Sequence, residues 1–237
     1  MWALRQGLSW LLQQLLPPAC PLCRQTFPAA WAAPLCAGCL AGISPLPAAH
    51  CTCCALPFTA TAGSAHLCGR CLKQPPGFNK VFALGLFSGT LRDAIHQLKF
   101  SQRVSLDRPL ARLLTEKIPA DSAFDLIVPV PLHRLKLQRR SYNQALLLAR
   151  ELGRCRDLPV AVRLLNKTVD TPPQQDLSAA ERWQNLKQVF RVEQQLQGEK
   201  ILLVDDVLTT GATVRSCSQA LLTAGAAEVQ VAVLARA

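Results

Sequence analysis

Cysteines are the first residues of this sequence whose spacing could do chemistry. Nine of the 11 fall between residues 20 and 71, and eight of these form four pairs whose partners are separated by two residues. The pairs are Cys20/Cys23, Cys36/Cys39, Cys51/Cys54 and Cys68/Cys71, with 12 residues between the first two pairs and 13 between the last two. This is one unit repeated twice. Each unit is typical of a zinc ribbon, in which two turns bring four thiolates onto one ion.

The surrounding residues favour zinc over disulfides and over other metals. No Asp or Glu precedes Asp93, so a cation that prefers oxygen ligands has nothing to bind in this segment. A reducing cytoplasm, which is the expected location, keeps thiols unpaired. Four thiolates also leave no open position on the metal for a reacting water. We therefore expect two structural zinc ions and not a catalytic one.

The assignment of the zinc ligands leaves alternatives open. Sequential pairing is preferred, with the first cysteine pair joining the second and the third joining the fourth. A cross-braced arrangement, in which the first pair joins the third, fits the spacing too. His50 or His66 could replace a cysteine at one site, and an iron–sulfur cluster is the minority alternative. Cys53 is a ninth thiol with no assigned role.

A second group of reactive residues lies in ILLVDDVLTTGAT, residues 201–213. Four aliphatic residues, typical of a buried strand, run into Asp205 and Asp206. The threonines and Gly211 that follow can bring hydroxyls, backbone N–H groups and a helix amino end to one place, which suits a phosphate. The neighbouring carboxylates suit sugar hydroxyls or magnesium, so the motif predicts a site for ribose 5-phosphate. The simpler alternative is a helix capped by Thr210 or Thr213, with both acids solvated.

The elements around this motif alternate between strands and helices. Strands are expected at 81–87, 124–130, 159–165, 201–204 and 228–234, and helices at 91–100, 105–117, 142–154 and 214–225. Such alternation predicts an α/β domain, a parallel sheet with helices on both faces, over residues 79–237. Residues 1–78 are expected to form an N-terminal helix and the cysteine-rich module. Ligands of parallel sheets bind at the carboxyl ends of the strands, where the two aspartates are expected.

The composition supports a folded, basic protein. Half of the 237 residues are hydrophobic and the net charge is +11, which the two zinc–thiolate centres would lower to about +7. A basic excess favours polyanionic partners, with single-stranded DNA as the candidate, although a merely solvated basic surface is an equal alternative. The apolar positions of residues 1–16 predict a short amphipathic helix, too short and polar to span a bilayer. A membrane surface is not an expected partner.

The motif at residues 201–213 and several further segments resemble the ComF/GntX family of competence and DNA-utilisation proteins. Members of this family join zinc ribbons to a type I phosphoribosyltransferase-like domain. The resemblance covers nearly the whole length. It is carried by ILLVDDVLTTGAT, VPVPLH at 128–133, RRSYNQA at 139–145, and the polar run from Lys167 to residue 186. It implies a ligand such as phosphoribosyl pyrophosphate, bound with magnesium, and a role in DNA uptake or in the use of DNA as a nutrient.

The resemblance also implies the roles of individual residues. The ribose hydroxyls would be held by Asp205 and Asp206, and the 5-phosphate by Thr209, Thr210, Gly211, Ala212 and Thr213. Candidates for pyrophosphate are Lys99, His133, Arg134, Arg139 and Arg140. Residues 166–187 would be a flap over the site, with Lys167, Gln175 and Arg182 as contributors.

Two departures from the family pattern bear on function. Thr209 stands where relatives that act on purines often carry an Asp, which argues against purine salvage and leaves it open whether the chain is a phosphoribosyltransferase. Ser141 replaces the glycine of an RGFNQ-like motif. No acceptor nucleophile can be identified. The alternative function is a non-enzymatic adaptor that binds single-stranded DNA or DNA-processing proteins.

Overall fold

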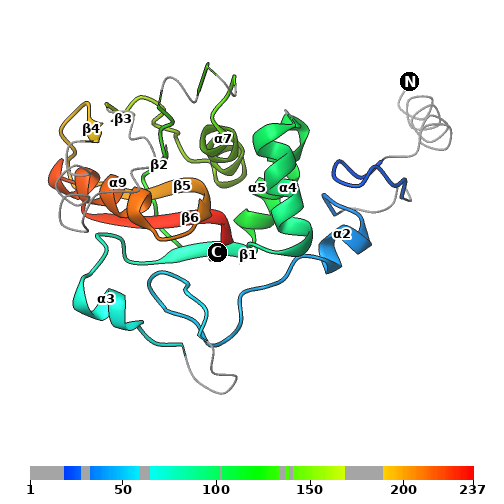
Figure 1. Cartoon of the computed structure of the whole chain (residues 1–237). Helices are drawn as coiled ribbons and strands as arrows, with labels where there is room; N and C mark the ends of the chain where they lie inside the picture. Colours follow the sequence, from blue (N-terminus) through cyan, green and yellow to red (C-terminus); the bar gives the residue numbers. More distant parts are fainter. Residues whose placement is uncertain are drawn as a thin grey trace.

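A four-stranded parallel sheet is the centre of the molecule (Figure 1). The computed structural model describes residues 19–27, 33–58, 65–101, 103–133, 137–138, 141–168 and 189–237. The strands are β1 (Val81–Leu86), β2 (Leu126–Pro129), β5 (Lys200–Leu208) and β6 (Glu228–Arg236), in the order β1-β6-β5-β2. The aliphatic runs that predicted them are buried, because a parallel sheet is covered on both faces.

Helices cover both faces of the sheet, as expected. Ala232 and Leu234 of β6 pack with α4 (Gly89–Phe100), α5 (Asp107–Thr115) and α7 (Gln144–Arg156). Val231 and Val233 point to the other face, which α9 (Ala212–Thr223) covers. A short 3-10 helix, η1 (Val104–Leu106), precedes α5. The predicted parallel α/β sheet with flanking helices, preceded by a cysteine-rich module, is confirmed.

The two cysteine-rich units pack on opposite faces of the sheet. The first contains α2 (Ala37–Ala41), and its Cys20, Leu22 and Leu35 join the core that α4 and α5 form. The second contains α3 (Gly69–Lys73), and its Cys51 and Cys71 join the core under α9. Figure 1 shows the first unit beside α4 and the second beneath β1. Because these cores are shared, the predicted domain boundary between residues 78 and 79 stays a prediction.

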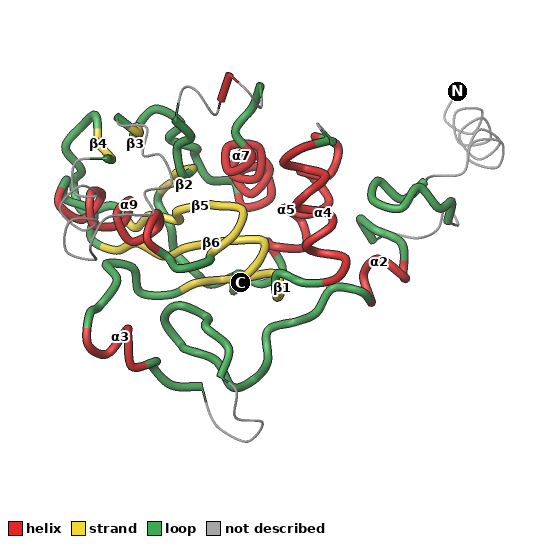
Figure 2. Tube along the Cα trace, in the orientation of Figure 1, coloured by secondary structure: helices red, strands yellow, loops and turns green. Residues whose placement is uncertain are grey.

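A second, two-stranded antiparallel sheet lies outside the main one (Figure 2). It consists of β3 (Leu165–Lys167) and β4 (Phe190–Val192), and the backbone N–H of Thr168 donates to the carbonyl of Val189 at 2.9 Å. Leu165 and Phe190 pack in the same core as α9. This pair brackets residues 169–188, which lie outside the described residues.

The strand predicted at 159–165 is wrong. Val160 makes a single parallel bridge to Ile127, and the chain then turns at residues 162–164 before β3 begins. Ile127 is bonded to Pro159 and Ala161, and the ladder stops there because the next bond would need an N–H from Pro129, which proline lacks. None of the helices among the described residues combines the length and apolarity that crossing a membrane requires.

Candidate functional site

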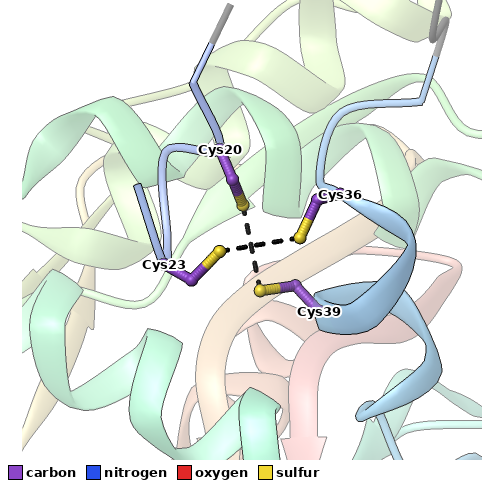
Figure 3. Close-up of side chains that lie close together, drawn as sticks. All are labelled: Cys20, Cys23, Cys36 and Cys39. Atoms are coloured by element: carbon purple, nitrogen blue, oxygen red, sulfur yellow. Dashed lines mark hydrogen bonds between the residues drawn. The ribbon is translucent and has the colours of Figure 1, made fainter. Parts of the chain in front are cut away.

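The first four cysteines converge as ligands of one metal ion would. Each offers a sulfur atom, and the sulfurs of Cys20, Cys23, Cys36 and Cys39 all lie within 4.8 Å of one another. Cys20 Sγ is 3.8 Å from Cys39 Sγ, and Cys23 Sγ is 3.6 Å from Cys36 Sγ (Figure 3). A tetrahedral zinc with bonds of about 2.3 Å places its sulfurs about 3.8 Å apart. The cysteines therefore fit zinc.

The second four cysteines repeat this arrangement. Cys51, Cys54, Cys68 and Cys71 form the other group, and Cys54 Sγ lies 3.8 Å from Cys68 Sγ. The backbone N–H groups of Cys54 and Cys68 point to Cys51 Sγ at 3.5 and 3.3 Å, as suits a sulfur that carries negative charge. Sequential pairing is confirmed, and the cross-braced alternative is wrong.

Neither histidine is needed to complete these groups. His50 Nδ1 is 2.7 Å from the carbonyl oxygen of Pro47, and the His66 ring stacks on Phe58 with ring centroids 4.3 Å apart. Cys53, which had no assigned role, is buried, and its thiol donates to the carbonyl of Phe78 at 3.3 Å. That bond joins the second unit to the segment that enters β1.

Each unit starts with the same tight turn. The backbone N–H of Arg24 donates to the carbonyl of Cys20, and that of Ala55 to the carbonyl of Cys51, both at 2.9 Å. Arg24 and Ala55 adopt positive φ angles of 66° and 55° at equivalent positions. The internal repeat is therefore present in backbone geometry as well as in cysteine spacing.

Asp205 and Asp206 lie inside β5, which ends at Leu208, and not at the boundary between strand and loop where they were predicted. β5 continues to Leu208 because β6 stays beside it as far as Arg236. On the other side of β5, however, β2 ends at Pro129, and the last bond there is from the N–H of Val130 to the carbonyl of Val204 at 2.8 Å. At Asp205 and Asp206, β5 thus has a neighbouring strand on one side only among the described residues, and we call this place the aspartate notch.

Lys99 reaches this notch from the last turn of α4. Its Nζ lies 2.9 Å from Asp206 Oδ1, and the two side chains are 20% and 13% exposed. Lys99, one of the predicted pyrophosphate candidates, is therefore in direct contact with the aspartate pair through Asp206. At this degree of burial the ion pair offsets part of the repulsion between the carboxylates.

Asp205 is partly buried, as is Asp206, and its pKa is shifted. Burial, and after it the charge of Asp206, raises the pKa of Asp205 to about 7. Its Oδ1 accepts a hydrogen bond of 2.8 Å from the backbone N–H of Asp206, which together with Lys99 partly offsets the rise. The pair therefore carries less than two full negative charges at neutral pH. Asp205 could donate a hydrogen bond to a ligand hydroxyl when it is protonated, or accept one when it is ionised.

The loop after the aspartates presents the amino end of α9 to solvent. Thr209, Thr210 and Thr213 are exposed, and Gly211 is the N-cap residue with a φ of 79°. The alternative of a capped helix fits poorly, because the N-cap has no side-chain cap and Thr210 Oγ1 accepts from the Ala212 N–H only at 3.4 Å. First-turn amides of a helix have no partner within it, so this end can receive an anion.

A turn before α7 holds the neighbouring segments together, and sequence reasoning missed its role. Asn143 caps α7 by accepting from the N–H of Ala145, and its Nδ2 donates to the carbonyl of Val130, both at 3.0 Å. The hydroxyl of Tyr142 donates to the carbonyl of Leu98, next to Lys99. The end of β2, the end of α4 and the start of α7 are thereby fixed around the aspartate notch.

Ser141, in the same turn, has a φ of 65°, a conformation that favours glycine. We expect Ser141→Gly to raise the free energy of unfolding by up to about 1 kcal/mol, because the relief of strain exceeds the added flexibility of the unfolded chain. Urea denaturation would measure it. Ser101, also exposed but with a φ of −103°, is the matched control, and Ser101→Gly should give no gain. Equal changes in both variants would contradict the explanation.

The remaining predicted residues lie farther along the chain. His133 is in the loop after β2, where its carbonyl accepts from the N–H of Leu137 at 3.0 Å, and Lys167 ends β3. The other predicted contributors, Arg134, Arg139, Arg140, Gln175 and Arg182, lie outside the described residues. The structure thus brings together Lys99, the aspartate pair and the loop at 209–213.

Two family models match the chain. A double zinc ribbon domain matches residues 11–72, and a phosphoribosyl transferase domain matches residues 137–237. Low-similarity structural matches include a glutamine phosphoribosylpyrophosphate amidotransferase from B. subtilis, with a TM-score of 0.43 and 18% identity over 59% of this chain and 30% of that chain. A purine phosphoribosyltransferase from Pyrococcus horikoshii gives a TM-score of 0.36 and 19% identity over 54% and 70% of the two chains.

Curated relatives match over most of their length. The chain is 36% identical over 220 residues to competence protein F of Haemophilus influenzae, which covers 86% of this chain and 90% of the relative. It is 39% identical over 193 residues to DNA utilization protein YhgH of Escherichia coli K12, covering 78% of this chain and 83% of the relative. With both cysteine groups formed and the sheet in place, the chain belongs to the ComF/YhgH family, which combines a double zinc ribbon with a phosphoribosyltransferase-like domain.

Proposed function

We propose that this protein binds phosphoribosyl pyrophosphate, or a similar phosphorylated ribose, and acts in the cytoplasm in the uptake or utilisation of DNA. One observation carries the ligand: an aspartate pair in a notch of the sheet lies a few residues before an exposed helix amino end that lacks a side-chain cap. The link to DNA is supported by the names of the relatives, a competence protein and a DNA utilization protein. The basic composition is consistent with a polyanionic partner.

The residues of the notch suit the parts of such a ligand. The amides and threonine hydroxyls of residues 209–213 would donate to the 5-phosphate, and Asp205 and Asp206 would accept from the ribose hydroxyls. Lys99 would exchange part of its contact with Asp206 for the pyrophosphate, and Arg134, Arg139 and Arg140 are further candidates to bind that group. Magnesium, bound together with the ligand, would supply charge neutralisation for the pyrophosphate.

If the protein is also a phosphoribosyltransferase, the bond from C1 of the ribose to pyrophosphate breaks as a bond to an acceptor forms. Asp205 and Asp206 would orient the ring through its hydroxyls, and Lys99 would stabilise the charge that develops on pyrophosphate. A carboxylate is missing at Thr209, so the protein supplies no acid or base there toward a purine.

Thermal unfolding with and without the ligand tests the proposal. With phosphoribosyl pyrophosphate and magnesium at about 100 times the Kd, we expect Tm to rise by about 5–10 °C, the equivalent of about 2.7 kcal/mol for a chain of this size. Asp206→Asn should abolish the rise. Asp93→Asn is the matched control, since Asp93 is exposed and pairs with Arg92 at 3.1 Å away from the notch. A melting curve of the unsubstituted protein that ligand leaves unchanged would rule the proposal out.

A non-enzymatic adaptor for single-stranded DNA or DNA-processing proteins is the second candidate, and the net charge of +11 favours it. Pyrophosphate release from phosphoribosyl pyrophosphate with a panel of bases separates an enzyme from an adaptor. Titration of labelled single-stranded DNA at two salt concentrations tests the DNA contact, which should weaken steeply as salt rises.

A further inference from the structure

Three consecutive carbonyls of the loop after β5 accept hydrogen bonds from arginines. Arg236 Nη1 donates to the carbonyls of Leu208 and Thr209, at 2.9 and 2.8 Å. Arg70 Nη1 donates to the carbonyl of Thr210, at 3.0 Å. Both arginines therefore lie on the side of the loop to which its carbonyls point.

These bonds fix where the amides of the loop point. In a planar trans peptide the N–H points opposite to the C=O of the same peptide unit. With the carbonyls of residues 208–210 turned toward the arginines, the N–H groups of Thr209, Thr210 and Gly211 are turned away from them. At Leu208 this direction is also set by the sheet, since the N–H of Ala237 donates to the same carbonyl at 3.0 Å. The Thr209 N–H thus points away from β6, to the side of β5 where β2 has already ended. This is the side of the aspartate notch.

Both arginines are tied to the second zinc ribbon. Arg70 lies in α3, between the ligands Cys68 and Cys71. Arg236 is 6% exposed, and its Nε donates to the carbonyl of Cys54 at 3.0 Å. The guanidinium tolerates this burial because its donors bond to main-chain carbonyls, and zinc bound by the four thiolates, with a formal charge of about −2, would favour it further.

A third arginine makes the same connection one turn into α9. Arg215 is 6% exposed, and its Nη1 donates to the carbonyls of Gln74 and Pro75, at 2.9 and 3.3 Å. These two residues follow α3 directly. Both the loop and the helix that would receive a phosphate are therefore bonded to the ribbon.

Little side-chain packing supports the loop from below. A cavity of about 370 Å³ separates it from the ribbon, lined by loop residues 208–211, by all three arginines and by ribbon residues that include Cys54, Cys68 and Phe78. On the side of the loop that borders this cavity, the hydrogen bonds from Arg236 and Arg70 connect its backbone to the ribbon and so help to fix the orientation of its peptide units.

We propose that Arg236 and Arg70 are positioning residues that aim the amides of the loop at the phosphate, and that through them the second zinc ribbon sets the affinity of the site. The affinity part rests on the proposed function. The first ribbon, which packs against α4 and α5, has no such bonds to the loop among the described residues.

Arg236→Met in the zinc-loaded full-length chain tests this in two ways. Hydrogen exchange followed by mass spectrometry, without ligand, should show faster exchange of the amides at 209–214 than in the unsubstituted protein. The Kd for phosphoribosyl pyrophosphate should rise about tenfold or more. Arg236→Lys, which keeps the charge but loses the planar fork, should give an intermediate Kd. Arg92→Met is the matched control, because Arg92 is exposed and pairs only with its neighbour Asp93 among the described residues.

The zinc content of each variant separates positioning from unfolding. Two zinc ions per chain must be retained in Arg236→Met; if they are not, Arg70→Met replaces it, since Arg70 is exposed and its truncation leaves the core intact. Unchanged loop exchange and unchanged Kd in a protein that binds the ligand would overturn this inference and leave the proposed function standing. If the loop amides of Arg236→Met exchange faster but the unsubstituted protein binds no phosphoribosyl pyrophosphate, the proposed function is ruled out. The role of the arginines in positioning the loop is then still supported.

Discussion

Removal of zinc by a strong chelator is expected to unfold both ribbons and to expose the two faces of the sheet that they cover. Apart from two five-residue helices and isolated bridges, the described parts of the ribbons have no regular structure that could persist without metal. Metal binding at such sites is worth about 10–16 kcal/mol, which exceeds the net stability of a typical domain. Circular dichroism and zinc release, followed together during chelation, would measure the loss. A cooperative thermal transition that is unchanged after both ions have left would contradict it.

Substitution of one ligand in each ribbon resolves the two ions. Cys39→Ser and Cys71→Ser change equivalent positions, the last ligand of each group. We expect each variant to bind one zinc per chain in place of two, with a lower Tm, because three thiolates hold structural zinc less tightly than four. A stoichiometry of two in either variant would show that the altered cysteine is not a ligand.

The second large effect concerns Asp205 and pH. Burial and the charge of Asp206 raise its pKa to about 7 in the folded protein, against about 3.9 in the unfolded chain. Between these values the folded state binds more protons, so the contribution of this group to stability is present at low pH and is lost as pH rises through 7. At pH 8 the ionised carboxylate costs about 4 kcal/mol relative to a neutral side chain.

Asp205→Asn should therefore stabilise the protein in the absence of ligand, and more so at high pH. We expect its gain in unfolding free energy to grow by about 1–2 kcal/mol between pH 6 and pH 8.5, a range in which the zinc sites stay loaded. The Asn oxygen can still accept from the Asp206 N–H, so the backbone contact is kept. Urea denaturation at several pH values would measure the trend, with Asp93→Asn as the exposed control. A gain that does not depend on pH would mean that the pKa of Asp205 is not raised in the folded protein.

The zinc sites and the position of the aspartates were predictable because their signals are local. Four cysteine pairs at fixed spacing specify the eight ligands, although the spacing left sequential and cross-braced pairing open, and strand alternation specifies at which edge of the sheet Asp205 and Asp206 lie. The predicted ends of strands were less accurate. β5 extends past the aspartates because β6 remains beside it, and the segment at 159–165 forms one bridge because Pro129 of β2 has no N–H for the next bond. Both outcomes depend on neighbouring strands.

The arginines around the second ribbon could not be predicted in the same way. Arg70, Arg215 and Arg236 bond to main-chain carbonyls, which every residue possesses, so the sequence carries no sign of the partner. Lys99 had a detectable signal only as a basic residue near a helix end, and its contact with Asp206 depends on how α4 packs beside β5. Such contacts follow from tertiary packing and become visible only in the folded structure.

The strand order has a consequence for synthesis on the ribosome. β6 is made after the other three strands of the main sheet, yet it lies between β1 and β5, so in the described part of the chain no other strand joins β1 to the sheet. A nascent chain can load zinc and pair β5 with β2, but β1 stays without a partner until residues 228–236 leave the exit tunnel. A message truncated before that point yields a product in which the edges of β1 and β5 that β6 would cover are unpaired. Such a product is expected to bind chaperones or to be degraded by proteases.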